Sequence, residues 1–323
     1  MYEPIFGVRG QPATVEFFTI AIEHDPLKVD LPGIMVTGSV EGPTLLITAG
    51  IHGCEYSGIE SALRLPPLLD APTLRGRVLI LPIVNMPAFR SRSAYVCPVD
   101  GKNMNRVFPG RRDGSFSEKV AAVIMEEAVA KVDYVIDLHG ADLVEYILPL
   151  TIFFKTGDHI VDEKSIALAE AYGLPYIVAT EPAHEWGGGG TLLAAASRAG
   201  VPSVLARAGG QGRVDKRDIS RHVTGILNVL KRVGMHDGVP NEYGPYTYIE
   251  EMVTPVASRD AVFRPWVDVG ETVRSGQVVG TIHDMFGRQV ETLLAPVSGV
   301  VLFVTTSPAV EKGFPLLGIG RLN

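Results

Sequence analysis

The stretch from Leu45 to Glu55 constrains the fold more than any other part of this sequence, because it reads as a buried strand that ends in two metal-ligand side chains. Leu45 to Ala49 is a short apolar run of the kind that a parallel strand shows when both of its faces are covered. Two glycines then break the run. His52 and Glu55 stand three residues apart, so one helical turn after the strand would aim both side chains at one point.

A second apolar run, Val135 to Leu138, ends in His139 and supplies the best candidate for a third ligand. Ligands in open α/β sheets bind beyond the carboxyl ends of the strands. Two histidines and a carboxylate with an open fourth position form the catalytic arrangement of zinc. A lone His-x-x-Glu arises often by chance and can be a solvated helical turn, but the two strand ends favour ligands. We therefore predict one Zn²⁺ per chain, held by His52, Glu55 and His139.

Two carboxylates, Asp137 and Asp142, flank the predicted ligand His139. Either one could orient the imidazole of His139 from outside the ligand set. Either could equally be an ordinary strand-end or turn carboxylate. The sequence leaves both roles open.

Strand-like and helix-like segments alternate over the first 240 residues, which predicts an α/β fold with a mixed, mainly parallel sheet and helices on both faces. Loose alternation in the first forty residues predicts edge strands. The polar connection 85–112 has little periodicity, and a loop of this length is usually functional. The predicted strands after the first are 78–84, 132–138, 176–179 and 201–206, and the predicted helices are 57–65, 117–131, 160–172, 191–198 and 218–233.

Composition changes near 238–245, and the sequence beyond consists of short β-rich pieces separated by Gly and Pro. We predict an α/β domain that carries the zinc site over 1–240 and a small β-domain over 245–323. The second resembles the β-sandwich of biotinyl and lipoyl carriers, a barrel-sandwich hybrid. A carrier needs a lysine at the tip of a hairpin, and the expected turn, Glu291 to Leu294, has none. The sequence thus argues against a carrier role.

Composition narrows the partners and the compartment. The net charge is −7 and no long basic run is present, so we expect neither nucleic acid nor an anionic membrane as a partner. The two cysteines are too few for a disulfide framework. No apolar run is long enough to cross a bilayer and no secretion signal is evident, so the expected location is the cytoplasm. A homo-oligomer is expected to be possible, since β-rich C-terminal domains often supply interfaces.

The pair Asn105-Arg106 is a candidate for binding substrate. A guanidinium beside an amide suits two-point binding of a carboxylate, although such a pair can also be a plain polar turn. The pair is followed by Phe108-Pro109-Gly110. This motif, preceded by His52-x-x-Glu55 and followed by Asp137-Leu138-His139, makes the chain resemble the succinylglutamate desuccinylase/aspartoacylase family, which is related to the zinc carboxypeptidases.

The resemblance extends from about Gly38 to the C-terminus and implies a zinc-carboxypeptidase-like fold with a β-domain that limits access to the active site. It implies zinc on His52, Glu55 and His139, with Asn105 and Arg106 holding a substrate carboxylate. The implied reaction is hydrolysis, by zinc-activated water, of the amide or a similar bond in a small carboxylate-bearing molecule such as an N-acyl amino acid.

One departure from the family concerns its general base. The family has a glutamate at the end of a strand that here reads Val201 to Ala206, and Arg207 stands in its place. An arginine cannot accept a proton from water. Three explanations remain open: another carboxylate reaches the water, with Glu181, Glu185 and Asp142 as candidates; Arg207 binds an anionic substrate or transition state; or the protein binds a ligand without turning it over.

A second departure concerns an arginine that the family often places before the Asn-Arg pair. Arg90 and Arg92 are the nearest arginines, and we take Arg92 as the candidate substrate ligand. Tyr95 falls closest to the expected place.

Overall fold

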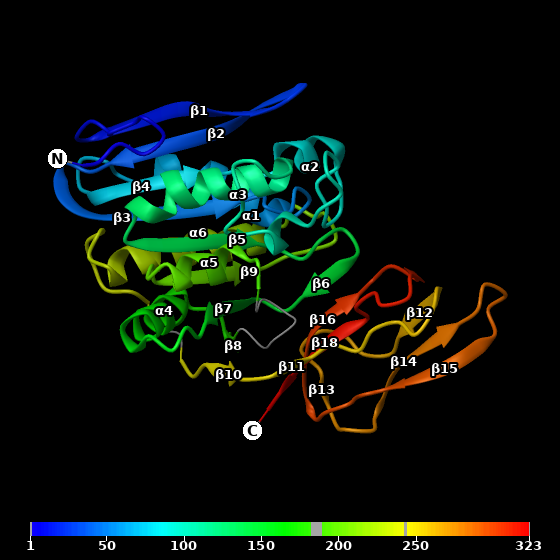
Figure 1. Cartoon of the computed structure of the whole chain (residues 1–323). Coiled ribbons are helices and arrows are strands. Elements are labelled where there is room, and N and C mark those ends of the chain that lie inside the picture. The colour runs from blue at the N-terminus through cyan, green and yellow to red at the C-terminus, as the bar shows by residue number, and fades with distance from the viewer. Residues whose placement is uncertain (1, 182–188, 242–243, 323) are drawn as a thin grey trace.

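The computed structural model describes residues 2–181, 189–241 and 244–322, and its main feature is a large mixed sheet (Figure 1). The sheet has nine strands among these residues, and their order across the sheet is β1 (Thr14–His24), β2 (Leu27–Thr37), β4 (Arg75–Leu81), β3 (Val40–Ala49), β5 (Tyr134–His139), β9 (Ser203–Arg207), β7 (Leu150–Phe154), β8 (Tyr176–Thr180) and β10 (Thr247–Ile249).

Parallel pairing joins the central strands of this sheet. β3 pairs in parallel with both β4 and β5, and β5 pairs in parallel with β9. The antiparallel pairs are β1 with β2, β2 with β4, and β7 with β9. The first two strands form a long hairpin at one edge, as the alternation near the N-terminus predicts. The predicted mixed α/β fold is confirmed at this level.

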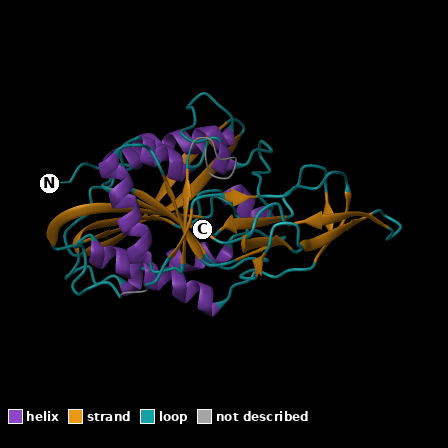
Figure 2. Cartoon of the chain, turned by 90° about the horizontal axis from the view of Figure 1, so that it is seen from below, coloured by secondary structure: helices purple, strands orange, loops and turns teal. Residues whose placement is uncertain are grey.

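Two hydrophobic cores lie against the large sheet, because successive side chains of a strand point to opposite faces. Leu45 and Ile47 pack with residues of α1, α4 and α6, whereas Leu46 packs with residues of α3 and α5. Figure 2 shows the helices gathered around these strands. The helices are α1 (Tyr56–Arg64), α2 (Met86–Ser91), α3 (Phe116–Glu127), α4 (His159–Tyr172), α5 (Leu192–Arg198) and α6 (Lys216–Arg232), with short 3₁₀ turns η1 (Pro66–Leu68), η2 (Met104–Arg106) and η3 (Val129–Lys131).

The C-terminal region forms two smaller antiparallel sheets (Figure 1). One consists of β11 (Met252–Val253), β18 (Leu317–Arg321), β16 (Gly299–Thr305) and β13 (Thr272–Val273), and β6 (Glu145–Ile147) from the first half of the chain also pairs with β16. The other consists of β15 (Gln289–Leu294), β14 (Val278–His283), β12 (Ala261–Pro265) and β17 (Ala309–Val310).

The hairpin turn expected at Glu291 to Leu294 is misplaced. Those residues belong to β15, and the turn between β14 and β15 is formed by the backbone hydrogen bonds of Asp284 with Gly287 and Arg288. This turn also contains no lysine. The sequence argument against a carrier role therefore holds at the correct turn as well.

Several elements differ from the sequence expectations. The connection 85–112 contains α2 and η2, and the strands β6, β7 and β10 were not predicted. β10 lies beyond residue 245 but pairs with β8 of the large sheet. No helix in the described parts of the chain is both long enough and apolar enough to span a bilayer.

Candidate metal centre and active site

The turn after β3 brings His52 and Glu55 together in a buried position. Gly50 has a φ of +68°, which L side chains rarely adopt, so glycine suits the turn that ends the strand. A Cβ at Gly53 would lie 2.2 Å from the backbone nitrogen of Phe89, so only glycine lets α2 approach so closely. His52 is 9% exposed and Glu55 is 2% exposed. Nδ1 of His52 lies 2.9 Å from Oε1 of Glu55.

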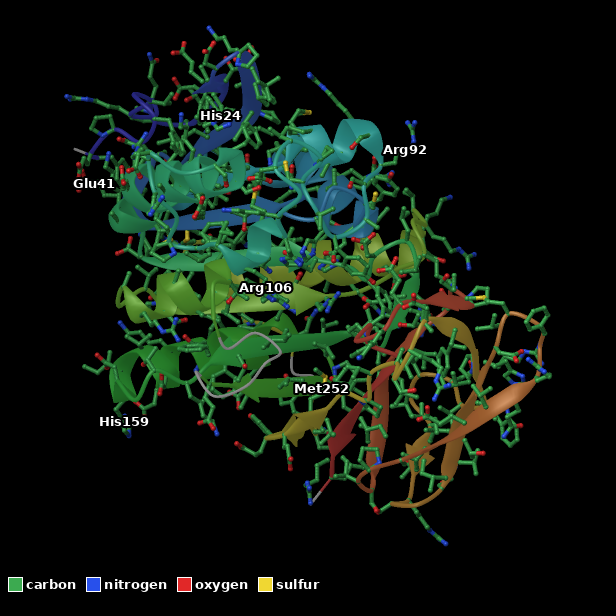
Figure 3. The ribbon with its side chains drawn as sticks, turned by 45° about the vertical axis from the view of Figure 1, so that its right-hand side comes forward. His24, Glu41, Arg92, Arg106, His159 and Met252 are labelled. Carbon is green, nitrogen blue, oxygen red and sulfur yellow. The ribbon has the colours of Figure 1, made fainter. Side chains whose placement is uncertain are left out.

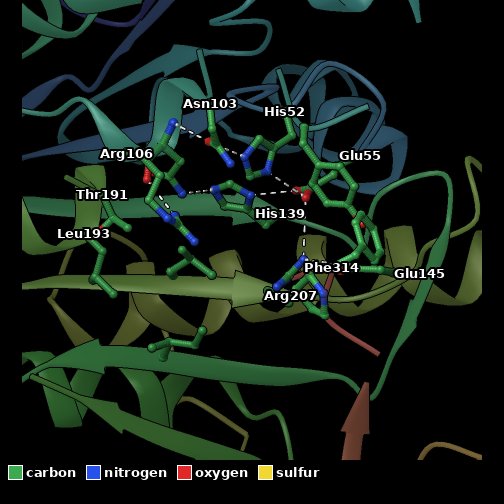
Figure 4. Close-up of a pocket in the computed structure, with 15 residues that line it drawn as sticks. His52, Glu55, Asn103, Arg106, His139, Glu145, Thr191, Leu193, Arg207 and Phe314 are labelled. Atoms are coloured by element: carbon green, nitrogen blue, oxygen red, sulfur yellow. Dashed lines mark hydrogen bonds and ion pairs between the residues drawn. The ribbon is translucent and has the colours of Figure 1, made fainter. Parts of the chain in front are cut away.

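His139 reaches the same point from the end of β5, which lies beside β3 in parallel register. Its Nδ1 lies 2.6 Å from Oε2 of Glu55. His52, Glu55 and His139 each offer one ligand atom, and these three atoms all lie within 4.8 Å of one another. The structure therefore brings the three predicted ligands together, as Figure 4 shows.

The outer nitrogens of both imidazoles have acceptors. Nε2 of His139 lies 3.0 Å from Oδ2 of Asp137, and Nε2 of His52 lies 3.0 Å from Oδ1 of Asn103. These oxygens can only accept, so each Nε2 donates and each Nδ1 of a neutral ring keeps its lone pair. Both lone pairs then face the carboxylate of Glu55. Acceptors that converge in this way, with outer hydrogen bonds fixing the rings, fit a divalent metal ion.

Charges in the metal-free centre agree with this account. Burial alone would lower the pKa of His139, but the carboxylates of Asp137 and Glu55 raise it to about 10. Burial alone would raise the pKa of Glu55, but its interactions with His139 and His52 lower it well below the ordinary value. Without a metal, the centre thus holds a proton where three acceptors meet. A cation can replace that proton.

Asp142 does not have the orienting role that the sequence left open. Its Oδ2 accepts a hydrogen bond from the backbone N–H of Tyr95 at 2.7 Å, and its Oδ1 accepts from the N–H of Leu143 at 2.6 Å. Asp142 therefore holds two loops in place, while Asp137 orients His139.

Asn105 and Arg106 lie on η2 and face the same cavity. Nδ2 of Asn105 lies 3.5 Å from Nε2 of His139, and its Oδ1 accepts from the N–H of Leu192 at 3.0 Å. Arg106 donates from Nη1 to the carbonyl of Asn105 at 2.7 Å. The pair therefore lies next to the centre, in a position open to a ligand.

Arg207 ends β9, directly beside His139 in the parallel register of β5 and β9. Its Nε donates to the carbonyl of Gly140 at 2.7 Å, and its Nη2 lies 3.6 Å from Oε1 of Glu55. The same Nη2 lies 3.8 Å from Oε2 of Glu145. Arg207 thus sits at the strand end where the resemblance places the family's base, with two carboxylates near its Nη2.

These residues line a cavity of about 230 Å³. Sequence reasoning missed its carboxylate Glu145 and its aromatic Phe314, because nothing in the short strand β6 or in the C-terminal region marks either position. Tyr95 also lines it. The full lining is His52, Glu55, Tyr95, Asn103, Asn105, Arg106, His139, Glu145, Ile152, Thr191, Leu193, Leu205, Arg207, Phe314 and Pro315.

Among the described residues, the sequence candidates Arg92, Glu181 and Asp142 are not part of this lining. Arg92 is exposed at the C-terminal end of α2, and Figure 3 shows it at the edge of the molecule, apart from Arg106. We therefore assign no substrate-binding role to Arg92. Glu181 is exposed at the end of β8. Glu185 lies outside the described residues.

Comparison with known proteins gives a consistent result. Residues 41–233 match the model of the succinylglutamate desuccinylase/aspartoacylase catalytic domain. The chain is 31% identical over 288 residues to the N-alpha-acetyl-L-2,4-diaminobutyric acid deacetylase of Halomonas elongata, which covers 84% of this chain and 83% of that protein.

Solved structures agree with this match. The succinylglutamate desuccinylase/aspartoacylase of Rhodobacter sphaeroides superposes with a TM-score of 0.82 at 31% identity, covering 92% of this chain and 90% of that one. The ectoine utilization protein EutE (DoeB) of Ruegeria pomeroyi, in its product-bound structure, shares the fold with a TM-score of 0.86 at 24% identity, covering 95% of both chains. This chain belongs to the succinylglutamate desuccinylase/aspartoacylase family.

Proposed function

We propose that this protein is a zinc-dependent deacylase that hydrolyses the acyl amide, or the corresponding ester, of a small carboxylate-bearing molecule such as an N-acyl amino acid. The observation that carries the proposal is the convergence of two imidazole Nδ1 atoms on the carboxylate of Glu55, each with its Nε2 fixed by an outer acceptor. A related protein that covers most of the chain is a deacetylase of an N-acetylated diamino acid.

The side chains of the cavity support this substrate class. Asn105 and Arg106 would bind the substrate carboxylate beside the centre and so orient the acyl group. Ile152, Leu193 and Leu205 form an apolar wall that suits the acyl or side-chain carbons. When bound, zinc would polarise the acyl carbonyl and acidify a water molecule. The outer hydrogen bonds from Asp137 and Asn103 would keep the two imidazoles in ligand orientation.

A second candidate function is binding of a small molecule without hydrolysis, and the position of Arg207 favours it. An arginine that contacts Glu55 stands where the family has its general base. Arg207→Glu separates the two candidates. If the wild type hydrolyses N-acyl amino acids and this substitution abolishes hydrolysis, the protein is an enzyme that uses its arginine. A gain of activity in Arg207→Glu would instead support a binding protein that has lost its base.

The metal claim is tested by elemental analysis of the purified protein and of His52→Ala, together with an activity screen over N-acetyl and N-succinyl amino acids. We expect one zinc per wild-type chain, and loss of both zinc and hydrolysis in the variant. His159→Ala, which removes an exposed histidine at the start of α4, is the matched control. Absence of zinc from the wild type and from His52→Ala, with unchanged folding, would contradict the proposal.

We also propose details of the fold, the domain boundary and the cellular location. The two cores support helices on both faces of the sheet, as in zinc carboxypeptidases, and the paired antiparallel sheets support a barrel-sandwich hybrid at the C-terminus. Two domains were predicted over 1–240 and 245–323; since β10 joins the large sheet, we propose that the change occurs after Ile249. Two free, buried cysteines suit a cytoplasmic location. Homo-oligomer formation stays a prediction.

A further inference from the structure

A carboxylate outside the metal-ligand set lies in the wall of the cavity. Glu145 is 8% exposed and lines the same cavity as the three predicted ligands. Figure 4 shows it near Arg207 and Phe314. Burying a carboxylate is costly, so such a group usually has charged partners or a part in chemistry. The ligand set gives Glu145 no part.

Arg207 connects this carboxylate with the candidate metal centre. Its Nη2 lies 3.8 Å from Oε2 of Glu145 and 3.6 Å from Oε1 of Glu55. The distance between the two carboxylate oxygens is therefore at most the sum of these two distances. Both carboxylates also line the same cavity of about 230 Å³, which is large enough to hold a water molecule.

The backbone of Glu145 is held by its own turn and by two other segments of the chain. Its N–H donates to the carbonyl of Asp142 at 3.2 Å, and its own carbonyl accepts from the N–H of Gln211 at 3.0 Å. Within β6 it pairs with Thr305 of β16. Main-chain pairing thus fixes the backbone from which the carboxylate projects, on a rigid element of the kind that suits a functional side chain.

The charged and titratable groups around Glu145 are Arg207, Tyr95, Glu55 and Asp142. Burial raises the pKa of Glu145 and outweighs Arg207 and Tyr95, which lower it, while Glu55 and Asp142 add to the increase. A carboxyl group whose pKa is raised toward the working pH is a better proton acceptor than an ordinary glutamate.

The other described carboxylates near the site are already engaged or lie elsewhere. Asp137 holds His139, and Asp142 holds the backbone of Tyr95. Glu181 is exposed and is absent from the cavity lining. Among the described residues, Glu145 is the acidic side chain of the cavity wall other than the ligand Glu55.

We propose that Glu145 is the proton-transfer residue of this enzyme, in place of the glutamate that the family has where this chain has Arg207. The proposal rests on the proposed deacylase function. Glu145 accepts a proton from water while the water oxygen forms a bond to the acyl carbon. It then gives this proton to the amine nitrogen as the carbon–nitrogen bond breaks, so the products are the acid and the free amine. Arg207 holds the Glu145 carboxylate in position.

The first test compares kcat, KM and zinc content in wild type, Glu145→Gln and Glu145→Asp. Loss of general acid–base assistance predicts a fall in kcat of about 10²–10⁴-fold in Glu145→Gln, with KM and zinc content near those of wild type. Glu145→Asp, which keeps a carboxylate, recovers part of this loss. Glu181→Gln tests the exposed alternative. A kcat in Glu145→Gln close to that of wild type, or a loss confined to Glu181→Gln, would overturn the proposal.

The second test does not depend on turnover. A phosphonate analogue, in which tetrahedral phosphorus replaces the acyl carbon, is titrated into the zinc-loaded protein by calorimetry in two buffers of different ionisation enthalpy. We expect wild type to take up a proton on binding, because Glu145 becomes protonated beside the analogue oxygen. Glu145→Gln takes up none. Equal proton uptake by both proteins would refute the role of Glu145.

The two tests separate this proposal from the proposed function. A protein that binds no zinc, hydrolyses none of the acyl amino acids and does not bind the analogue is not a zinc deacylase, and both proposals fall together. A protein that binds zinc and the analogue but shows no effect of Glu145→Gln keeps the proposed function and loses the role of Glu145.

Discussion

Each imidazole of the candidate metal centre has one nitrogen directed at Glu55 and one directed at an outer acceptor. For His139 the outer acceptor is Asp137, whose other oxygen accepts a hydrogen bond from the hydroxyl of Thr48 at 2.7 Å. Asp137 lies on β5 beside Thr48 of β3 and is fully buried, so it has no freedom to turn away. The orientation of His139 is thus built into the sheet.

Asp137→Asn should weaken zinc binding, because the amide is a weaker acceptor and no longer fixes the ring of His139. Loss of such an outer partner costs about 10–100-fold in metal affinity. Competition against a chromophoric chelator measures the change. Asp133→Asn is the matched control, since that carboxylate binds the N–H of Thr44 at the opposite end of the same strands. Equal affinities in wild type and Asp137→Asn would contradict the expectation.

Arg207→Gln should move the acidic limb of the kcat/KM profile to higher pH. The positive charge of Arg207 lowers the pKa of Glu145, so removing that charge raises this pKa further. Because a proton acceptor works only when deprotonated, the variant needs a higher pH to reach its full rate. The check is kcat/KM measured across the pH range in zinc-saturating buffer. An acidic limb that stays in place, or moves to lower pH, would show that the titrating group is not Glu145.

At the scale of elements, the sequence predicts strands and helices where apolar residues recur regularly. It does not predict a site residue that lies on a very short strand. The apolar runs that become β3 and β5 identify three predicted ligands, because a parallel sheet must bring the ends of its strands to one edge. β6 has three residues, too few for a periodic signal. Glu145 lies on it, so no sequence pattern favours this carboxylate over Asp142.

His222 shows the same limit of local sequence patterns. His222 lies on α6 and is fully buried. Its Nδ1 lies 2.8 Å from the hydroxyl of Tyr172 on α4. The three-to-four spacing of apolar positions along α6 places His222 on the inner face. Its partner Tyr172 comes from a different helix, so no local sequence pattern indicates the contact.

His222 should make stability depend on pH. Burial lowers the pKa of His222 to about 4, whereas a histidine in the unfolded chain has a pKa of about 6.5. Below about pH 6.5 the unfolded chain therefore binds a proton that the folded chain rejects, and the free energy of unfolding falls until about pH 4, by about 3 kcal/mol in total.

His222→Gln keeps an acceptor for Tyr172 but does not titrate. Urea unfolding of metal-free wild type and variant between pH 7 and pH 4.5 measures the difference in stability. Wild type should lose more stability than the variant over this range. Parallel pH profiles would contradict the assignment of the slope to His222.

At the scale of the whole molecule, the C-terminal region helps to form the cavity. Phe314 and Pro315 line it, and the ring of Phe314 meets Tyr95 edge to face with centroids 6.1 Å apart. The resemblance to the family predicted a β-domain that limits access to substrate. The sequence alone could not indicate Phe314, because its contact with Tyr95 joins residues that are far apart in the chain.

Phe314→Ala should raise KM more than it lowers kcat, because the ring contributes to the wall and not to the metal centre. Loss of an aromatic contact worth about 0.5–1.5 kcal/mol corresponds to about a 2–10-fold increase in KM. Steady-state kinetics on the best N-acyl amino acid measures it. Phe286→Ala, at an exposed hairpin tip, is the control. A fall in kcat with unchanged KM would assign the ring a different role.

The pairing of β6 with β16 has a consequence for recombination among relatives. Thr305 faces Glu145 across this pair, and Ile147 faces Phe303. Side chains alternate along a strand, so a slip of one residue would turn Glu145 to the opposite face. A chimera that joins residues 1–249 to the C-terminal part of another family member must therefore preserve this frame. Otherwise the graft would displace the acidic side chain of Glu145 while leaving the three predicted metal ligands in place.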